Sequence, residues 1–189
     1  MDDSKKPGMI SLADRRPIFI VGYMASGKTT FGQALAKAAG RNFIDLDFYI
    51  EQRFHQSISE IFASGGEASF RRKEAAMLRE AGEFENVVIA CGGGTPCFSD
   101  NMDFMLSHGT VVFLEATVEK MARRLEINNG RRPLMAGKSA EEIRKTIREG
   151  LEARLPFYER AHIRFSGEEL EDRRQIDNAV KNFCTGNFF

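Results

Sequence analysis

The chain has 189 residues, and its 27 Lys and Arg side chains balance 27 Asp and Glu side chains, so the formal net charge at pH 7 is zero. This balance argues against a general nucleic-acid binder or a membrane-surface protein, because both depend on an excess of positive charge. The three cysteines, Cys91, Cys97 and Cys184, follow no metal-ligand spacing. We therefore expect reduced thiols in a cytoplasmic protein, with no nucleic-acid or membrane partner.

The length is typical of one domain. Residues 1–14 are polar and contain no apolar segment of the kind found in secretory signals, so they are predicted to form a disordered lead-in. No apolar stretch approaches the roughly 20 residues that span a bilayer. Residues 15–189 are accordingly predicted to form a single domain.

Short apolar runs alternate with helical patterns, which predicts an α/β fold with helices on both faces of a five-stranded parallel sheet. Pro156 lies inside a long helical pattern and is expected to kink or split it. The predicted strands are Ile18–Val21, Asn42–Asp45, Val87–Cys91, Val111–Leu114 and Ile163–Phe165. The predicted helices are Lys28–Ala39, Leu46–Phe54, Ser59–Ala63, Glu67–Gly82, Asp100–Leu106, Val118–Ile127, Ala140–Tyr158 and Asp172–Phe183.

The first predicted strand leads into the sequence GYMASGKT at residues 22–29. It matches the P-loop pattern G-x-x-x-x-G-K-[ST] between a strand and a helix, the context that this motif requires. Backbone N–H groups of such a loop surround phosphate oxygens, and the following helix adds its positive dipole end. Lys28 is expected to reach the β- and γ-phosphates and Thr29 to bind Mg²⁺. The predicted ATP-binding residues of this segment are Gly22, Tyr23, Met24, Ala25, Ser26, Gly27, Lys28, Thr29 and Thr30.

Asp45 and Asp47 follow the second predicted strand. Ligands of open α/β sheets bind at the carboxyl ends of the strands, so these carboxylates are well placed to contact Mg²⁺ and a substrate hydroxyl near the P-loop. Helix N-capping is an equally good explanation from spacing alone, because aspartate at a strand–helix junction commonly caps the first turn.

Arg71 and Glu74 lie three residues apart on a predicted helix and can therefore pair. A guanidinium held by a carboxylate is oriented to bind a substrate carboxylate or phosphate. Because residues 71–73 form a run of charged residues, a solvent-exposed helix face is a more common explanation of this spacing than a binding site.

Three glycines, Gly92, Gly93 and Gly94, follow the third predicted strand, where they allow close approach of the backbone to a ligand or form a plain turn.

Residues 128–138 form a polar segment that carries Arg131 and Arg132, and a lid arginine of this kind can neutralise the charge of a moving phosphoryl group.

Taken together, these stretches resemble shikimate kinase over roughly residues 16 to 165. The P-loop alone is common to many kinases, whereas the combination of motifs in this order is specific to the family. The motifs are the P-loop, Asp-x-Asp at 45–47, Phe-Arg-x-x-Glu at 70–74, the glycines at 92–94, Arg-Pro-Leu at 132–134 and Arg-x-Pro-x-Tyr at 154–158.

The resemblance implies a three-layer P-loop kinase fold with a mobile lid at about 126–139, and a monomer. It also implies transfer of the ATP γ-phosphate to the 3-hydroxyl of shikimate, in chorismate and aromatic amino-acid biosynthesis.

On the acceptor side, the resemblance assigns Asp47 to the ring hydroxyls, where it acts as the base. Arg71 and Arg154 correspond to the residues that bind the shikimate carboxylate; without the resemblance, Arg154 would be interpreted as a surface residue. Gly92, Gly93 and Gly94 correspond to the loop that lines the shikimate pocket.

On the nucleotide side, Asp45 corresponds to an outer-sphere Mg²⁺ contact beside Thr29. Lys28 and Arg132 correspond to the catalytic cations, Arg132 being the lid arginine at the transferring phosphate. Arg124 is similar to the arginine that stacks on adenine.

One position departs from the family pattern, because Ala25 stands where a third glycine is usual. The substitution puts nucleotide affinity in question but not the reaction. Two alternative functions stay open: a related kinase with gluconate or a nucleotide as acceptor, and a nucleotide-binding module without turnover.

Overall fold

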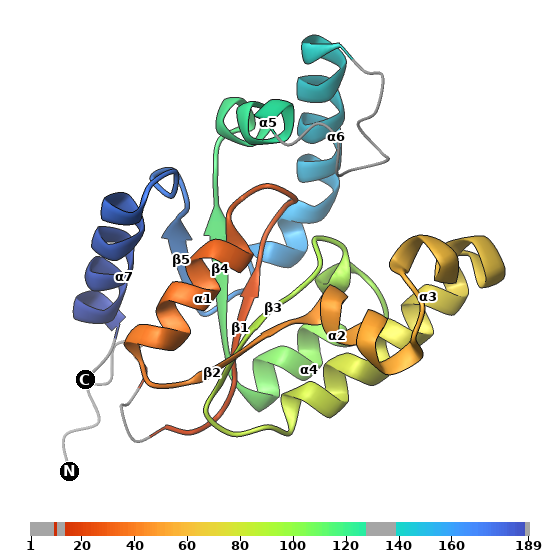
Figure 1. Ribbon diagram of the computed structural model, residues 1–189, viewed down its shortest axis with the longest axis horizontal. Helices are drawn as coiled ribbons and strands as arrows, with labels where there is room; N and C mark the ends of the chain where they lie inside the picture. The colour runs from red at the N-terminus through yellow and green to blue at the C-terminus, as the bar shows by residue number, and fades with distance from the viewer. Residues whose placement is uncertain (1–9, 11–13, 128–138, 188–189) are drawn as a thin grey trace.

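The computed structural model describes residues 10, 14–127 and 139–187. Its core is a five-stranded sheet with the order β2-β3-β1-β4-β5, in which every neighbouring pair is parallel. Helices flank both faces (Figure 1), which confirms the predicted fold class. The strands are β1 Ile18–Val21, β2 Asn42–Asp45, β3 Val87–Ala90, β4 Thr110–Glu115 and β5 Ile163–Ser166.

Seven α-helices and a short 3₁₀-helix are assigned within the described residues. They are α1 Lys28–Ala38, α2 Leu46–Phe54, α3 Ile58–Gly82, η1 Thr95–Cys97, α4 Asn101–His108, α5 Val118–Ile127, α6 Ala140–Tyr158 and α7 Arg173–Asn187.

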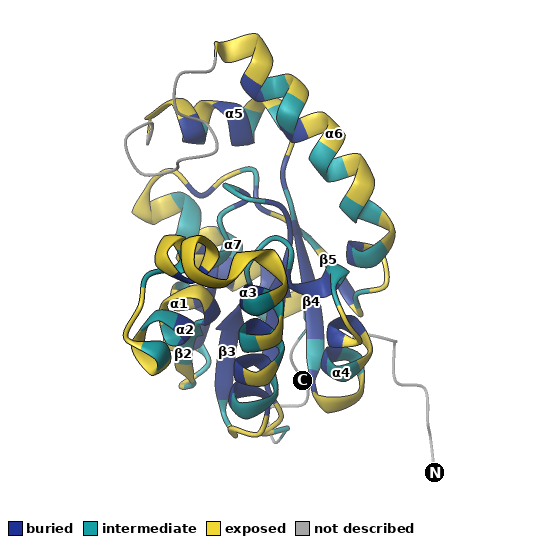
Figure 2. Ribbon diagram, turned by 90° about the vertical axis from the view of Figure 1, so that its right-hand side faces the viewer, coloured by how far each residue is buried: buried dark blue, intermediate teal, exposed yellow. Residues whose placement is uncertain are grey.

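The two-residue period of the strands separates two hydrophobic cores. On β1, Ile18 and Ile20 pack with buried side chains of α1 and α7, whereas Phe19 and Val21 pack with those of α3, α4 and α6. The central strands β3, β1 and β4 are accordingly the most buried part of the sheet, and exposed residues lie on the outer faces of the helices (Figure 2).

Two helix predictions differ from the structure. The predicted helices 59–63 and 67–82 both lie within α3, which is interrupted at Gly66, where φ is 66° and ψ is −177°. Pro156 was predicted to kink or split its helix; it does not split α6, which continues to Tyr158. Pro156 lies in the last turn of α6, and its missing N–H removes only the helical hydrogen bond to the carbonyl of Glu152.

Of the predicted lead-in 1–14, Ile10 and Asp14 are among the described residues. Ile10 is buried in the core beside α1 and α7, and its N–H donates to the carbonyl of Asn187. In the part of the chain that the structure describes, no helix is long and apolar enough to cross a membrane.

Candidate active site

A cavity of about 600 Å³ opens at the carboxyl ends of the strands. Loops that follow β1, β2 and β3 form its lining together with α5 and the segment after β5, as expected for a parallel sheet. Its lining residues are Met24, Ala25, Gly27, Lys28, Thr29, Thr30, Asp45, Asp47, Cys91, Gly92, Gly93, Arg124, Leu125, Leu170 and Glu171.

The loop between β1 and α1 has three residues with positive φ: Gly22 at 148°, Ala25 at 61° and Gly27 at 104°. A side chain at position 22 would place its Cβ 2.4 Å from the carbonyl oxygen of Leu114, so only glycine fits there. Ala25 adopts a left-handed conformation that costs an L-residue about 1 kcal/mol. The loop therefore takes a strained shape at the position where the family pattern has glycine.

Lys28 begins α1, and its ammonium group donates hydrogen bonds of 2.8 Å to the carbonyls of Gly22 and Tyr23. These bonds hold the positive charge inside the curve of the loop. A phosphate that enters the loop would find this charge beside the first N–H groups of α1.

Asp45 caps α2 and also contacts the first turn of α1. Its Oδ1 accepts a hydrogen bond of 3.3 Å from the N–H of Phe48 and so caps α2, while its Oδ2 accepts one of 2.8 Å from the hydroxyl of Thr29. Two oxygen-bearing side chains from β2 and α1 thus meet at the cavity, in the chemistry that Mg²⁺ prefers.

Asp47 lies in the first turn of α2 and lines the cavity. Although its side chain is open to the cavity, the surrounding protein desolvates its carboxylate, and the charges of Asp45 and Glu74 repel it further. Both effects outweigh the attraction of Lys28 and raise the pKa of Asp47 to about 6. A carboxyl group with such a pKa can accept a proton near neutral pH.

Arg71 is not part of a solvated charged surface. Its side chain is 16% exposed, and its Nη1 donates a hydrogen bond of 2.7 Å to Glu74, whose side chain is 1% exposed. Thr95 donates a second 2.7 Å hydrogen bond to the same carboxylate, and the Phe98 ring lies 3.8 Å from the guanidinium carbon. These contacts hold Arg71 in one orientation.

The glycine loop passes close to three of the side chains that were predicted to belong to the site. A Cβ at position 92 would lie 2.8 Å from Oδ1 of Asp47, and one at position 94 would lie 2.7 Å from Nη2 of Arg71. At position 93 it would lie 3.3 Å from Nη1 of Arg154. The loop is therefore more than a plain turn, because it lets these side chains converge on one edge of the sheet.

The two arginines reach this loop from different helices, Arg71 from α3 and Arg154 from α6. Among the described residues, Arg71, Gly94 and Arg154 do not belong to the lining of the cavity but border its glycine wall.

Arg124 is fixed by several hydrogen bonds. Its guanidinium donates to the P-loop carbonyls of Ala25 and Ser26 at 3.2 and 3.0 Å, to the carbonyl of Gly167 at 2.7 Å and to the carboxylate of Glu171 at 2.9 Å. This network joins α5, the P-loop and the segment after β5. Its guanidinium lies at the rim of the cavity beside the P-loop.

The segment between β5 and α7 was missed by the sequence analysis as part of the site. It supplies Leu170 and Glu171 to the cavity, and a Cβ at position 27 would lie 2.6 Å from Cδ1 of Leu170. Leu170 is 7% exposed although it lies in a polar run, and the single apolar residue in that run was the available signal.

Arg131 and Arg132 lie outside the described residues, as does most of the expected lid at 126–139. The remaining predicted residues lie together at the carboxyl edge of the sheet.

Comparison with known proteins agrees with this geometry. The family model described as shikimate kinase matches residues 24–185. The chain is 52% identical over 166 residues to a shikimate kinase of Parabacteroides distasonis, a match that covers 86% of this chain and 96% of the relative.

Two solved structures share the fold. The shikimate kinase of Bacteroides thetaiotaomicron is 48% identical and superposes with a TM-score of 0.87, over 90% of this chain and 97% of that one. The shikimate kinase of Acinetobacter baumannii in complex with shikimate is 33% identical, with a TM-score of 0.77 over 90% and 92% of the two chains.

Proposed function

The chain belongs to the shikimate kinase family, and we propose that it transfers the γ-phosphoryl group of ATP to the 3-hydroxyl of shikimate, giving shikimate 3-phosphate and ADP. The observation that carries this proposal is the convergence of Asp47, Arg71 and Arg154 on the glycine loop beside a P-loop. The reaction would serve chorismate and aromatic amino-acid biosynthesis.

In the proposed step, the 3-hydroxyl oxygen forms a bond to the γ-phosphorus while the bond from that phosphorus to the β–γ bridging oxygen breaks, and ADP leaves. Asp47 accepts the proton of the hydroxyl, for which its pKa of about 6 is suitable. Lys28 stabilises the charge of the phosphates, a role for which it must exchange the carbonyls of Gly22 and Tyr23 for phosphate oxygens.

Recognition of the acceptor follows from its charge. Shikimate carries one carboxylate and several hydroxyls, and planar guanidinium groups bind carboxylates with two parallel hydrogen bonds. We assign this binding to Arg71 and Arg154, and the contacts with the ring of the substrate to Gly92, Gly93 and Gly94.

Thr29 and Asp45 fit the Mg²⁺ ion that accompanies ATP, because both present oxygen atoms to the cavity. When bound, the ion neutralises charge on the β- and γ-phosphates. Since Asp45 holds the hydroxyl of Thr29, it would orient that oxygen and contact the ion through water. Chelation of Mg²⁺ should abolish turnover, and added Mg²⁺ should restore it.

We assign the adenine-binding surface to Arg124 and Leu170. The edge of the Arg124 guanidinium is occupied by hydrogen bonds to carbonyls and Glu171. The face of the guanidinium and the Leu170 side chain can therefore stack on a base. Arg132 remains the proposed lid arginine at the transferring phosphate.

Three broader expectations remain part of the proposal: that residues 15–189 form one domain, that the enzyme is a monomer and that it is cytoplasmic. Gel filtration at assay concentration tests the second.

The proposal is tested by coupled ADP release with MgATP against shikimate, quinate, gluconate and a nucleoside monophosphate. We expect release with shikimate to be far faster than with the others. Preference for gluconate or a nucleotide would retain the P-loop assignment and overturn the acceptor site. ATP binding without release in the presence of any acceptor would indicate a nucleotide-binding module.

A further inference from the structure

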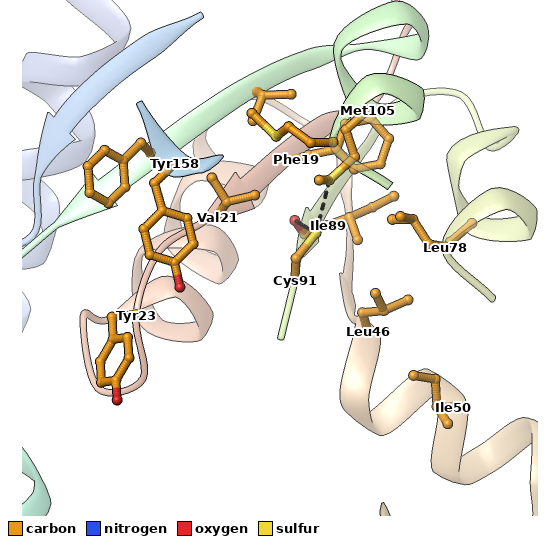
Figure 3. Packing of buried hydrophobic residues seen from close by; sticks show 14 of the residues in the cluster. Phe19, Val21, Tyr23, Leu46, Ile50, Leu78, Ile89, Cys91, Met105 and Tyr158 are labelled. Atoms are coloured by element: carbon orange, nitrogen blue, oxygen red, sulfur yellow. Dashed lines mark hydrogen bonds between the residues drawn. The ribbon is translucent and has the colours of Figure 1, made fainter. Parts of the chain in front are cut away.

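The second residue of the P-loop, Tyr23, has a side chain that turns away from the phosphate site. It is 3% exposed and belongs to the same hydrophobic cluster as Val21 and Tyr158 (Figure 3). Its hydroxyl lies 3.4 Å from the carbonyl oxygen of Thr146 on α6. Tyr23 thus connects the nucleotide loop to the helix that carries Arg154.

Gly150 makes room for this ring in α6. A Cβ at position 150 would lie 2.2 Å from the hydroxyl oxygen of Tyr23 and 2.9 Å from its Cζ, closer than atoms can approach. Glycine destabilises a helix interior relative to alanine. Its presence in the third turn of a 19-residue helix is explained by the tyrosine that packs against it.

Arg154 lies on the same face of α6, because Thr146, Gly150 and Arg154 are spaced by four residues. Its guanidinium carbon lies 5.1 Å from the centroid of the Tyr23 ring, within the range of a cation–π contact. Burial raises the pKa of the Tyr23 hydroxyl, and the positive charge of Arg154 lowers it by a smaller amount. The Tyr23 ring is therefore one contact of this guanidinium, which also interacts with the hydroxyl of Tyr158.

The backbone of Tyr23 takes part in the other half of the site, since its carbonyl accepts a hydrogen bond from Lys28. One residue therefore contacts the cation of the phosphate site through its backbone and the guanidinium at the glycine loop through its ring.

We propose that Tyr23 is a positioning residue, which aims Arg154 at the acceptor carboxylate and links the nucleotide loop to the acceptor site. This inference rests on the proposed function, because it requires the acceptor to carry a carboxylate that Arg154 binds. The space that Gly150 leaves on the surface of α6 accommodates the large aromatic ring of Tyr23.

The test compares Tyr23→Leu, which removes the ring, with Tyr23→Phe, which keeps it. A cation–π contact of this kind corresponds to about a five- to tenfold change in affinity. We expect Tyr23→Leu to raise the KM for shikimate by about that factor, with a smaller effect on the KM for MgATP. Tyr23→Phe should raise the KM for shikimate much less than Tyr23→Leu does, since it keeps the ring and the 3.4 Å hydrogen bond contributes little.

A double-mutant cycle separates positioning of Arg154 from general damage to the fold. In an Arg154→Met background, Tyr23→Leu should have almost no further effect on the KM for shikimate. The carboxamide analogue of shikimate gives a second measure: the preference of the enzyme for the carboxylate over the amide should shrink in Tyr23→Leu. Equal effects of Tyr23→Leu in both backgrounds, with an unchanged preference, would overturn the inference.

Gly150→Ala approaches the same contact from the helix. Its Cβ must displace the Tyr23 ring, so it should raise the KM for shikimate, and its effect should be smaller when combined with Tyr23→Leu. Additive effects would also overturn the inference. A wild-type protein that does not phosphorylate shikimate would instead refute the proposed function, so the two failures are distinguishable.

Discussion

Nη1 of Arg71 donates a hydrogen bond of 2.7 Å to Oε2 of Glu74, within a single helix. The acid is almost fully buried, so the pair exists in an environment with little water to screen it. Removal of one partner from such a pair leaves a buried charge or a misplaced guanidinium.

Glu74→Ala should therefore lower the free energy of unfolding by about 3 kcal/mol and raise the KM for shikimate. It removes the buried partner of Arg71 and the acceptor of the Thr95 hydroxyl. Thermal unfolding and steady-state kinetics measure the two effects. Glu67→Ala is the matched control, because Glu67 pairs with the same arginine at 3.2 Å but is 57% exposed. Its effect on stability should stay within about 0.5 kcal/mol, and an equal loss in both variants would contradict the role of burial.

Asp47→Asn should abolish most turnover and yet stabilise the fold. Loss of a general base lowers kcat by about a hundredfold or more. The pKa of Asp47 is raised from 3.8 to about 6 on folding, so the folded state binds more protons in this interval and the ionised carboxylate costs stability above it. The gain in melting temperature over wild type should be absent below pH 4, grow up to about pH 6 and then level off.

Melting curves between pH 3.5 and 8 measure this gain. Asp177→Asn is the control, since Asp177 is exposed on α7, and it should show no such pH-dependent gain. A near-normal kcat in Asp47→Asn would remove Asp47 from the role of base.

The ionisation of Asp47 should also determine how the activity falls at acidic pH. The value of kcat/KM for shikimate should rise with pH and level off above a midpoint near pH 6, because a protonated Asp47 cannot accept the proton. The charge of Asp45 raises the pKa of Asp47, so Asp45→Asn should move this midpoint to lower pH, whatever its effect on the maximal rate. An unmoved midpoint would assign this fall in activity to another group.

Local sequence features predicted most of the fold and identified many of the residues that line the cavity. The strands and the P-loop are recognisable because each is a contiguous pattern with a fixed period or spacing. The alternative explanations for Asp45 could not be separated, since one carboxylate both caps α2 and contacts Thr29.

Contacts between distant segments could not be predicted. Arg124 donates to carbonyls on loops that lie on either side of it in the chain, at Ser26 and Gly167, and only the order of the strands brings these loops together. The burial of Glu74 was likewise hidden, because the charge run at 71–73 has the composition of a surface.

Gly94→Ala should raise the KM for shikimate more than it lowers stability. The new Cβ would lie 2.7 and 2.9 Å from the terminal nitrogens of Arg71, so the guanidinium must move away from its position. Steady-state kinetics with shikimate measure the effect. Gly186→Ala is the control, because nothing lies within 4 Å of a Cβ at that position on α7, and it should leave the KM unchanged. An unchanged KM in Gly94→Ala would show that Arg71 need not hold this position.

Ala25→Gly should tighten the binding of ATP without destabilising the protein. The left-handed φ of 61° costs alanine about 1 kcal/mol in the folded loop, whereas glycine adopts it freely. The greater freedom of glycine in the unfolded chain offsets about 0.5–1 kcal/mol of this gain. Stability should therefore change by less than about 1 kcal/mol. Bound phosphate holds the loop in this shape, so the part of the strain that the free loop can relax away is imposed again on binding and should appear in the Kd for the nucleotide, measured by titration calorimetry.

Ala76→Gly gives the contrast, because Ala76 is exposed in the middle of α3. There the same substitution should cost about 1 kcal/mol, since glycine weakens a helix interior and relieves no strain. If Ala25→Gly destabilises the protein as much as Ala76→Gly and leaves the Kd unchanged, the strain at Ala25 has no effect on nucleotide binding. In that case the alanine at this position would be a neutral replacement for the glycine of the family pattern.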